Sequence, residues 1–265
     1  MGDIANNDKK FILLIDILGY KAMSKKSSIE DLLNKIGSLI TAASDAGEFV
    51  GGVKSYVYAD TIVFIPLEQK YNTLAELIQI ARLVLFWSNY VAICGGEYIP
   101  IRGAIGYGEV RVVGPALTTK NIGIGNSRAR VANNVQMLIG NGLLDAYEAE
   151  QQLELMGVIL SDTVASVEAV QKFSDGVIKG DLIKYNCPLK INKKNEKKNV
   201  AKKVKLLVNQ LDMANIDAGI AKMQERAILH TGDVQNKYKN TVDFLHYSGS
   251  LIKKEFALMT AQSNQ

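Results

Sequence analysis

A short apolar run that ends in a carboxylate is the feature that most constrains this chain. Residues 11–16 are FILLID, and Gly19 follows three residues after Asp16. So short and apolar a run is typical of a buried strand, and the glycine indicates a tight turn after it. Leucine and isoleucine recur at three-to-four spacing over residues 29–40, which predicts a helix next.

A second carboxylate lies in a predicted hairpin. Residues 54–58 and 61–66 are rich in β-formers and are separated only by Ala59 and Asp60. A helix over residues 73–94 and a strand over 99–107 complete the order β, α, β, β, α, β. This is the ferredoxin-like βαββαβ unit of an α+β protein, and we expect an antiparallel sheet with helices on one face.

The rest of the chain adds αβ elements to this core. Residues 108–134 contain glycines and basic residues without helical periodicity, so we expect a long hairpin or loop. We then predict a strand over residues 135–139, a helix over 142–155, a strand over 158–160, a helix from Ser161 or Asp162, and a closing strand over 179–185. The sequence pattern of residues 206–258 predicts two helices and no strand.

Positive charge is concentrated in one segment. Residues 190–205 hold eight lysines and one glutamate, whereas the whole chain has a net charge of only +4. We therefore expect a solvated linker or helix face there, and no stable nucleic-acid binding. The predicted units are a catalytic-type domain over residues 10–188, a Lys-rich linker over 189–205 and a helical C-terminal extension over 206–265.

Cysteine and histidine are too scarce for several common kinds of site. Cys94 and Cys187 lie far apart, and the two histidines come near the end of the chain. No disulfide framework, zinc motif or serine elbow is present, and no apolar stretch reaches the roughly 18 residues of a membrane span. We expect a cytoplasmic protein whose chemistry does not need histidine.

The two aspartates are the informative pair. In a βαββαβ unit the first strand lies beside the hairpin, so Asp16 and Asp60 can converge and hold two Mg²⁺ or Mn²⁺ ions. The alternative is that Asp60 only forms the turn and Asp16 only caps a helix. The backbone N–H groups of Ile17, Leu18, Gly19 and Tyr20 could bind a triphosphate, or could form a simple strand-to-helix turn.

Five segments resemble, in order, the sheet motifs of class III nucleotidyl cyclases, and most closely those of the bacterial pyrimidine cyclases of Pycsar antiphage defence. They are DILGYKAM at residues 16–23, YADTIVF at 58–64, IRGAIGYGE at 101–109, IGNGLLDAYEAE at 139–150 and VIKGDLIKY at 177–185.

The resemblance implies roles for single residues. Asp16 and Asp60 match the two metal aspartates, with the Ile17 carbonyl as a further ligand, and Lys179 matches a lysine that holds the terminal phosphates. Tyr56 stands where adenylate cyclases carry a base-selecting lysine, which favours UTP or CTP over ATP, although core packing is an alternative role. Arg102 matches an Arg-Gly of the pyrimidine cyclases and either binds substrate or pairs with a carboxylate such as Glu109.

One departure concerns the transition state. The family carries an Asn and, four residues later, an Arg on the helix after strand five, where this chain has Leu144 and Glu148. Either one of the arginines supplies the missing charge, or catalysis relies more on metal; the candidates are Arg102, Arg111, Arg128 and Arg130.

The function implied is that of a metal-dependent uridylate cyclase, which converts UTP to 3′,5′-cyclic UMP and diphosphate as a signal for a separate effector protein. The resemblance also implies a homodimer with composite sites. A cytidylate cyclase and a non-catalytic nucleotide-binding domain are the alternatives.

Overall fold

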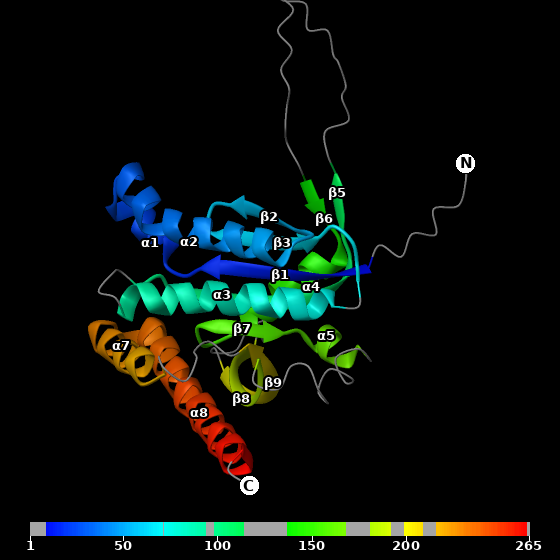
Figure 1. Cartoon of the computed structure of the whole chain (residues 1–265). Helices are drawn as coiled ribbons and strands as arrows, with labels where there is room; N and C mark the ends of the chain where they lie inside the picture. Colours follow the sequence, from blue (N-terminus) through cyan, green and yellow to red (C-terminus); the bar gives the residue numbers. More distant parts are fainter. Residues whose placement is uncertain are drawn as a thin grey trace, which may run out of the picture.

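The computed structural model describes residues 9–70, 72–93, 98–113, 137–167, 181–191, 199–208 and 216–263 (Figure 1). The elements of the core unit are β1 (Lys9–Ile17), α1 (Tyr20–Lys26), α2 (Ile29–Val50), β2 (Val53–Tyr58), β3 (Thr61–Pro66), α3 (Thr73–Ile93) and β4 (Ile101–Glu109). The elements after it are β5 (Arg111–Val113), β6 (Met137–Ile139), α4 (Asn141–Gln152), β7 (Gly157–Leu160), α5 (Asp162–Ser166), β8 (Leu182–Ile191), β9 (Asn199–Val208), α7 (Ile216–Leu229) and α8 (Gly232–Ser263).

The main sheet has seven strands in the order β2-β3-β1-β4-β7-β9-β8. Strand β1 pairs antiparallel with both β3 and β4, and β2 pairs antiparallel with β3, which is the pairing of a ferredoxin-like unit. Strand β7 adds parallel to β4. The predicted α+β class and βαββαβ core are confirmed. Strands β5 and β6, at the two ends of the predicted excursion, form a separate antiparallel pair.

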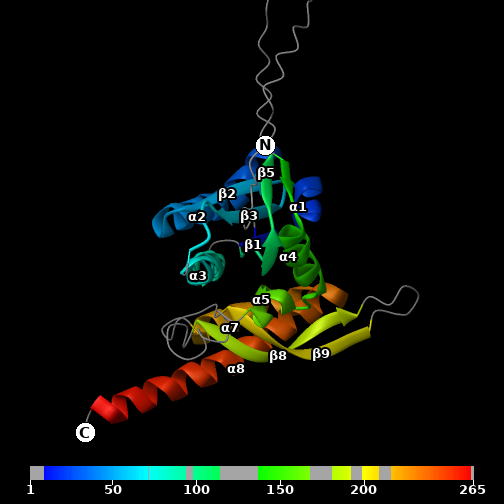
Figure 2. The same ribbon diagram turned by 90° about the vertical axis from the view of Figure 1, so that its right-hand side faces the viewer.

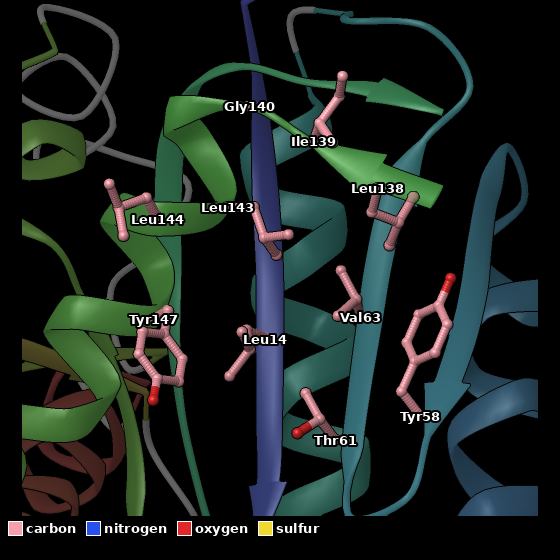
Figure 3. Close-up of a pocket in the computed structure, with 10 residues that line it drawn as sticks. All are labelled: Leu14, Tyr58, Thr61, Val63, Leu138, Ile139, Gly140, Leu143, Leu144 and Tyr147. Atoms are coloured by element: carbon pink, nitrogen blue, oxygen red, sulfur yellow. The ribbon is translucent and has the colours of Figure 1, made fainter. Parts of the chain in front are cut away.

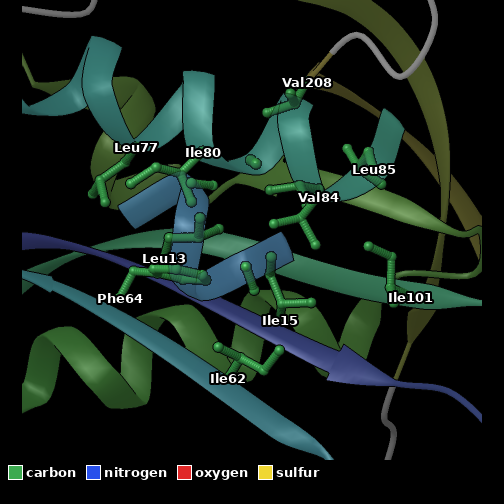
Figure 4. Close-up of a cluster of buried hydrophobic side chains, with 14 of the residues drawn as sticks. Leu13, Ile15, Ile62, Phe64, Leu77, Ile80, Val84, Leu85, Ile101 and Val208 are labelled. Atoms are coloured by element: carbon green, nitrogen blue, oxygen red, sulfur yellow. The ribbon is translucent and has the colours of Figure 1, made fainter. Parts of the chain in front are cut away.

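The long helices of the βαββαβ unit, α2 and α3, lie on one face of the sheet, as expected for that unit, and α4, which follows the unit in the chain, covers the opposite face. Leu13 and Ile15 of β1 pack with α2 and α3 (Figure 4), whereas Ile12 and Leu14 pack with Ala146 of α4 on the opposite face. Figure 2 shows α2 and α3 on one side of the sheet and α4 on the other. The physical reason lies in the apolar run itself, because side chains that alternate between two faces need cover on both.

Helix α4 approaches β4 closely because glycines line the contact. A Cβ atom on Gly106 would lie 2.5 Å from the backbone nitrogen of Ala146. One on Gly108 would lie 2.7 Å from the nitrogen of Gly142. The glycines of the segment IRGAIGYGE therefore let the helix backbone pack directly on the strand, which fixes the position of α4 over the sheet.

The lysine-rich segment contains two strands rather than a linker. Residues 182–191 and 199–208 pair as the antiparallel strands β8 and β9, and β9 joins the main sheet between β7 and β8. Lys190 lies 2.9 Å from Glu154, and Lys205, which is buried, pairs with Asp162. Ion pairs thus let lysines occupy positions in β8 and β9. The many lysines made these strands difficult to predict from the sequence.

The C-terminal extension forms the two expected helices, α7 and α8, although residues 206–208 belong to β9. Side chains of α7 and α8, including Met223, Tyr238 and Phe244, pack into a second core with Leu153, Met156 and Leu207. The last turns of α8 project away from the body of the protein in Figure 2. Within the ranges described above, no helix is long and apolar enough to cross a membrane.

We predict that Gly106→Ala destabilises the protein by about 1–3 kcal/mol, because the added methyl group overlaps the backbone of α4. Gly37→Ala in α2 is the matched control, since no atom lies within 4 Å of its added methyl group. Its helix propensity should stabilise the protein by up to about 1 kcal/mol. Urea unfolding of both variants measures the difference, and equal free energies of unfolding would contradict the close contact.

Candidate active site

The two predicted aspartates meet at one end of the sheet. Asp16, near the end of β1, lies in register opposite Thr61, the residue that follows Asp60. The backbone N–H of Ile17 donates to the carbonyl of Asp60 at 2.8 Å. Ala59 has a φ of 53°, a left-handed conformation that closes the short β2–β3 turn. Backbone pairing therefore holds both carboxylates at the same place.

The charge of Asp60 acts on the carboxyl of Asp16. Burial raises the pKa of the Asp16 carboxyl above its usual 3.8, and the negative charge of Asp60 raises it further. The positive charges of Arg102 and Lys237 act in the opposite direction. Two carboxylates that repel each other in a partly buried site favour binding of a cation.

Arg102 lies opposite Asp16 on β4 and has carboxylates on two sides. Its Nη2 is 3.9 Å from Asp16 Oδ2, its Nε is in ion-pair contact with Glu150, and its Nη1 donates to the Leu153 carbonyl at 3.3 Å. The side chain is only 6% exposed. The carboxylate expected as its partner, Glu109, is exposed at the far end of β4, so the partner is Glu150 instead.

Glu150 is the residue of this cluster that the sequence analysis missed. It is buried on the inner face of α4, one and two turns after Ala146 and Gly142. Burial raises the pKa of its carboxyl, and the charge of Arg102 lowers it. The sequence did contain a signal for this residue. Gly142, Ala146 and Glu150 recur at four-residue spacing, which places the glutamate on the same face of the helix as the two small residues, and that face is buried.

The turn after β1 provides fewer free N–H groups than predicted. The N–H of Ile17 is bonded to Asp60, and that of Leu18 donates to the carbonyl of Pro100 at 2.8 Å. Neither is therefore available to a phosphate in this structure. Gly19, with a φ of 81°, precedes α1, and Tyr20 is the first residue of that helix. Of the four predicted groups, Gly19 and Tyr20 are the ones at the helix start.

An apolar cavity of about 690 Å³ lies beside the carboxylates (Figure 3). Its sheet wall includes Leu14, two residues before Asp16, and Thr61, the residue after Asp60, and Leu144 and Tyr147 of α4 form another wall. Tyr58, which the sequence analysis did not select, lines the cavity and is 44% exposed. The cavity has the volume and the mainly apolar lining usual in small-molecule sites.

Tyr56 lies on the same strand as Tyr58 but packs, half-buried, against the apolar cluster that contains Leu14 and Val63. Burial raises the pKa of its phenol, and Tyr58 raises it further. The phenol is therefore protonated at neutral pH and can donate one hydrogen bond. Its apolar neighbours agree with the core-packing role that the sequence left open.

The other residues considered for the site are either exposed or outside the described residues. Lys179, Arg128 and Arg130 lie outside the described residues. Arg111 is exposed on β5, and Leu144 and Glu148 are exposed on α4. In the described part of the chain, no three or more His, Cys, Asp or Glu side chains form a group that could hold a metal ion.

No protein-family model matches this chain, and a search of curated proteins finds no match. Among solved structures it is similar to the guanylate cyclase domain of RhGC from Catenaria anguillulae in complex with GTP, with 15% identity and a TM-score of 0.49 over 78% of this chain and 98% of that one. It is also similar to the adenylyl cyclase CyaB from P. aeruginosa, with 15% identity and a TM-score of 0.47 over 77% and 95% of the two chains.

A third similar structure is the dimeric guanylyl cyclase domain of the RhoGC fusion protein from the aquatic fungus Blastocladiella emersonii. Its identity is 14% and its TM-score 0.48, over 76% of this chain and 96% of that one.

We predict that Asp16→Asn stabilises the metal-free protein at neutral pH. Because the pKa of Asp16 is raised on folding, the folded chain binds its proton more tightly, and stability falls as pH rises above 3.8 toward the raised pKa. The gain should disappear at a pH well below 3.8, where wild-type Asp16 is protonated. Thermal unfolding across this pH range measures it, with Asp45→Asn, exposed on α2, as the control. A less stable Asp16→Asn variant at pH 7 would contradict the prediction.

We also predict that Glu150→Gln destabilises the protein by about 3 kcal/mol, because it leaves the buried Arg102 charge without its closest partner. Glu148→Gln, exposed on the same helix, should change the free energy of unfolding by no more than about 0.5 kcal/mol. Urea unfolding compares the two variants, and equal effects would show that the Arg102–Glu150 pair is not important for stability.

Proposed function

We propose that this protein is a metal-dependent nucleotidyl cyclase that converts UTP to 3′,5′-cyclic UMP and diphosphate. The observation that carries the proposal is the convergence of Asp16 and Asp60 at the ends of β1 and the β2–β3 turn. The repulsion between the two carboxylates supports a role in binding cations.

The donor set fits divalent ions that arrive with a triphosphate. Asp16 and Asp60 would hold Mg²⁺ or Mn²⁺, with the Ile17 carbonyl as a further oxygen ligand. Mg²⁺ is commonly bound by one or two carboxylates together with substrate phosphates and water, so a larger cluster of acidic side chains is not needed. When bound, two such ions would neutralise charge on the triphosphate and favour loss of the ribose 3′-OH proton.

In the reaction, the ribose 3′-oxygen loses its proton and forms a bond to the α-phosphorus, while the bond from that phosphorus to the bridging oxygen breaks and diphosphate leaves. The residues of the chain mainly position these groups and balance their charge. Gly19 and Tyr20, at the start of α1, are the proposed backbone donors to phosphate, and Lys179 is a proposed side-chain donor. Arg102, which is buried, is proposed to position Asp16 rather than to contact the substrate.

The cavity beside the carboxylates is proposed to hold the nucleoside. Its apolar lining suits the faces of a base, and Tyr58 and Thr61 provide hydroxyl groups for its polar edge. Tyr56 is proposed to narrow the pocket in favour of a pyrimidine. Uracil and cytosine both present O2 and differ at N3 and at the C4 substituent, so CTP is the alternative substrate.

We further propose that the active form is a homodimer with composite sites. Leu144, Tyr147 and Ile139 are each more than 40% exposed around the cavity, and a second copy would cover this apolar surface. Cyclic UMP would then act as a signal for a separate effector protein in bacterial antiphage defence of the Pycsar kind, in the cytoplasm.

A non-catalytic nucleotide-binding domain is the second candidate. The observation that favours it is the exposed face of α4, where Leu144 and Glu148 occupy the positions at which class III cyclases usually carry Asn and Arg. Such a protein would bind the nucleotide without releasing diphosphate.

Incubation with each of the four nucleoside triphosphates and Mn²⁺, followed by mass identification of products, tests the proposal. We expect cyclic UMP from UTP and on the order of a hundredfold less product from Asp16→Ala and Asp60→Ala, because each removes a proposed metal carboxylate. Asp45→Ala, an exposed aspartate of α2, should retain wild-type activity. Full activity in either site variant would exclude the mechanism, and nucleotide binding without a cyclic product would favour the second candidate.

A further inference from the structure

The guanidinium of Arg102 is shared unequally between two carboxylates. Its Nε is in ion-pair contact with Glu150 Oε1, whereas its Nη2 lies 3.9 Å from Asp16 Oδ2. A donor and an acceptor 3.9 Å apart are too far from each other for a hydrogen bond. The guanidinium therefore acts on Asp16 through its charge and does not occupy that carboxylate oxygen.

Groups at the C-terminal end of α4 hold the guanidinium in this position. The Leu153 carbonyl accepts from Arg102 Nη1 at 3.3 Å. The second oxygen of Glu150, Oε2, accepts from the side chain of Gln151 at 2.8 Å, so both oxygens of this carboxylate have a partner. Helix α4 is itself fixed by its close approach to Gly106 of β4. The guanidinium is thus held on the α4 side and away from β1.

The three side chains differ in their access to solvent. The side chain of Asp16 is 20% exposed, that of Arg102 is 6% exposed and that of Glu150 is 1% exposed. A ligand that arrives from solvent can contact Asp16 but has no access to Glu150. Any influence of Glu150 on a ligand bound at Asp16 must therefore act through Arg102.

We propose that Glu150 is a positioning residue that keeps Asp16 available to a divalent cation by holding the Arg102 guanidinium back from it. This inference rests on the proposed function, because it assumes that Asp16 and Asp60 bind a metal ion. A guanidinium can pair with a carboxylate through two parallel N–H···O bonds, which would occupy both oxygens that the metal ion needs. Glu150 prevents such a pair with Asp16 by offering the closer carboxylate.

Replacement of Glu150 by glutamine should release this constraint. A buried guanidinium without a paired carboxylate is costly, and Nη2 of Arg102 already lies 3.9 Å from Asp16, so the arginine should turn to Asp16. The alternative role of Glu150 is to stabilise the fold by neutralising Arg102, with no consequence for Asp16. In that case Glu150→Gln would lower the free energy of unfolding and leave the affinity for metal unchanged.

Titration of the full chain with Mn²⁺, followed by the electron paramagnetic resonance signal of the free ion, tests the proposal. We expect Glu150→Gln to weaken Mn²⁺ binding on the order of tenfold, as for loss of a residue that orients a metal ligand. The double variant Arg102→Met with Glu150→Gln also removes the competing cation and should recover most of the affinity. Glu148→Gln, exposed on the same helix, is the matched control and should bind like the wild type. Asp16→Asn should lose the binding, which identifies the site that is measured.

A second variant covers the case in which Glu150→Gln is too unstable to measure. Glu150→Asp keeps the negative charge, but its side chain is one methylene shorter and draws the carboxylate away from Arg102. We expect it to be more stable than Glu150→Gln and still to bind Mn²⁺ more weakly than the wild type. Thermal unfolding of each variant checks that the fold is intact.

The inference is overturned if both Glu150 variants bind Mn²⁺ as tightly as the wild type, if the double variant binds as weakly as Glu150→Gln, or if the wild type does not bind Mn²⁺. The cyclase assay separates these results from failure of the proposed function. Glu150-dependent binding of Mn²⁺ without a cyclic product supports the inference and rejects catalysis. Cyclic UMP formation whose dependence on the Mn²⁺ concentration is the same in Glu150→Gln and the wild type supports catalysis and rejects the inference.

Discussion

The register of β1 between β3 and β4 is the constraint on which the rest of the site depends. Because strand side chains alternate, this pairing puts Asp16 on the same face as Leu14 and Ile12, under α4 and opposite Arg102. A shift by one residue would turn Asp16 into the core beneath α2 and α3 and break the apolar packing on both faces. The position of the carboxylate is therefore protected by the same packing energy that holds the sheet together.

Several charged side chains surround Asp16, although its partly buried position disfavours the charged form of a carboxyl. Arg102 lies between Asp16 and Glu150, yet burial and the charge of Asp60 still leave the pKa of Asp16 raised. A carboxylate pair that is destabilised in the metal-free chain gains most when a cation binds, since binding relieves the repulsion. Glu150 holds the guanidinium on the α4 side, which keeps Arg102 from neutralising Asp16 completely.

Local patterns in the sequence predicted the elements of the core unit well, whereas contacts between distant segments were harder to predict. The run FILLID and the residues around Asp60 specified β1 and the β2–β3 hairpin within a few residues. Strand β9 was missed because its lysines obscured its alternation, and its ion pair from Lys205 to Asp162 depends on the assembled sheet. Glu150 was missed for the same reason, since its partner Arg102 is remote in sequence.

The cations that act on Asp16 come from two distant parts of the chain. Helix α4 exposes Leu144 and Glu148 beside the cavity side of the sheet, and neither side chain carries a positive charge. The positive charges that act on Asp16 come instead from Arg102 on β4 and Lys237 on α8. Arg102 is held between Asp16 and Glu150, whereas Lys237 belongs to a helix whose buried side chains pack into the second core. The C-terminal helices therefore add a cation to the electrostatics of Asp16, in addition to covering the second core.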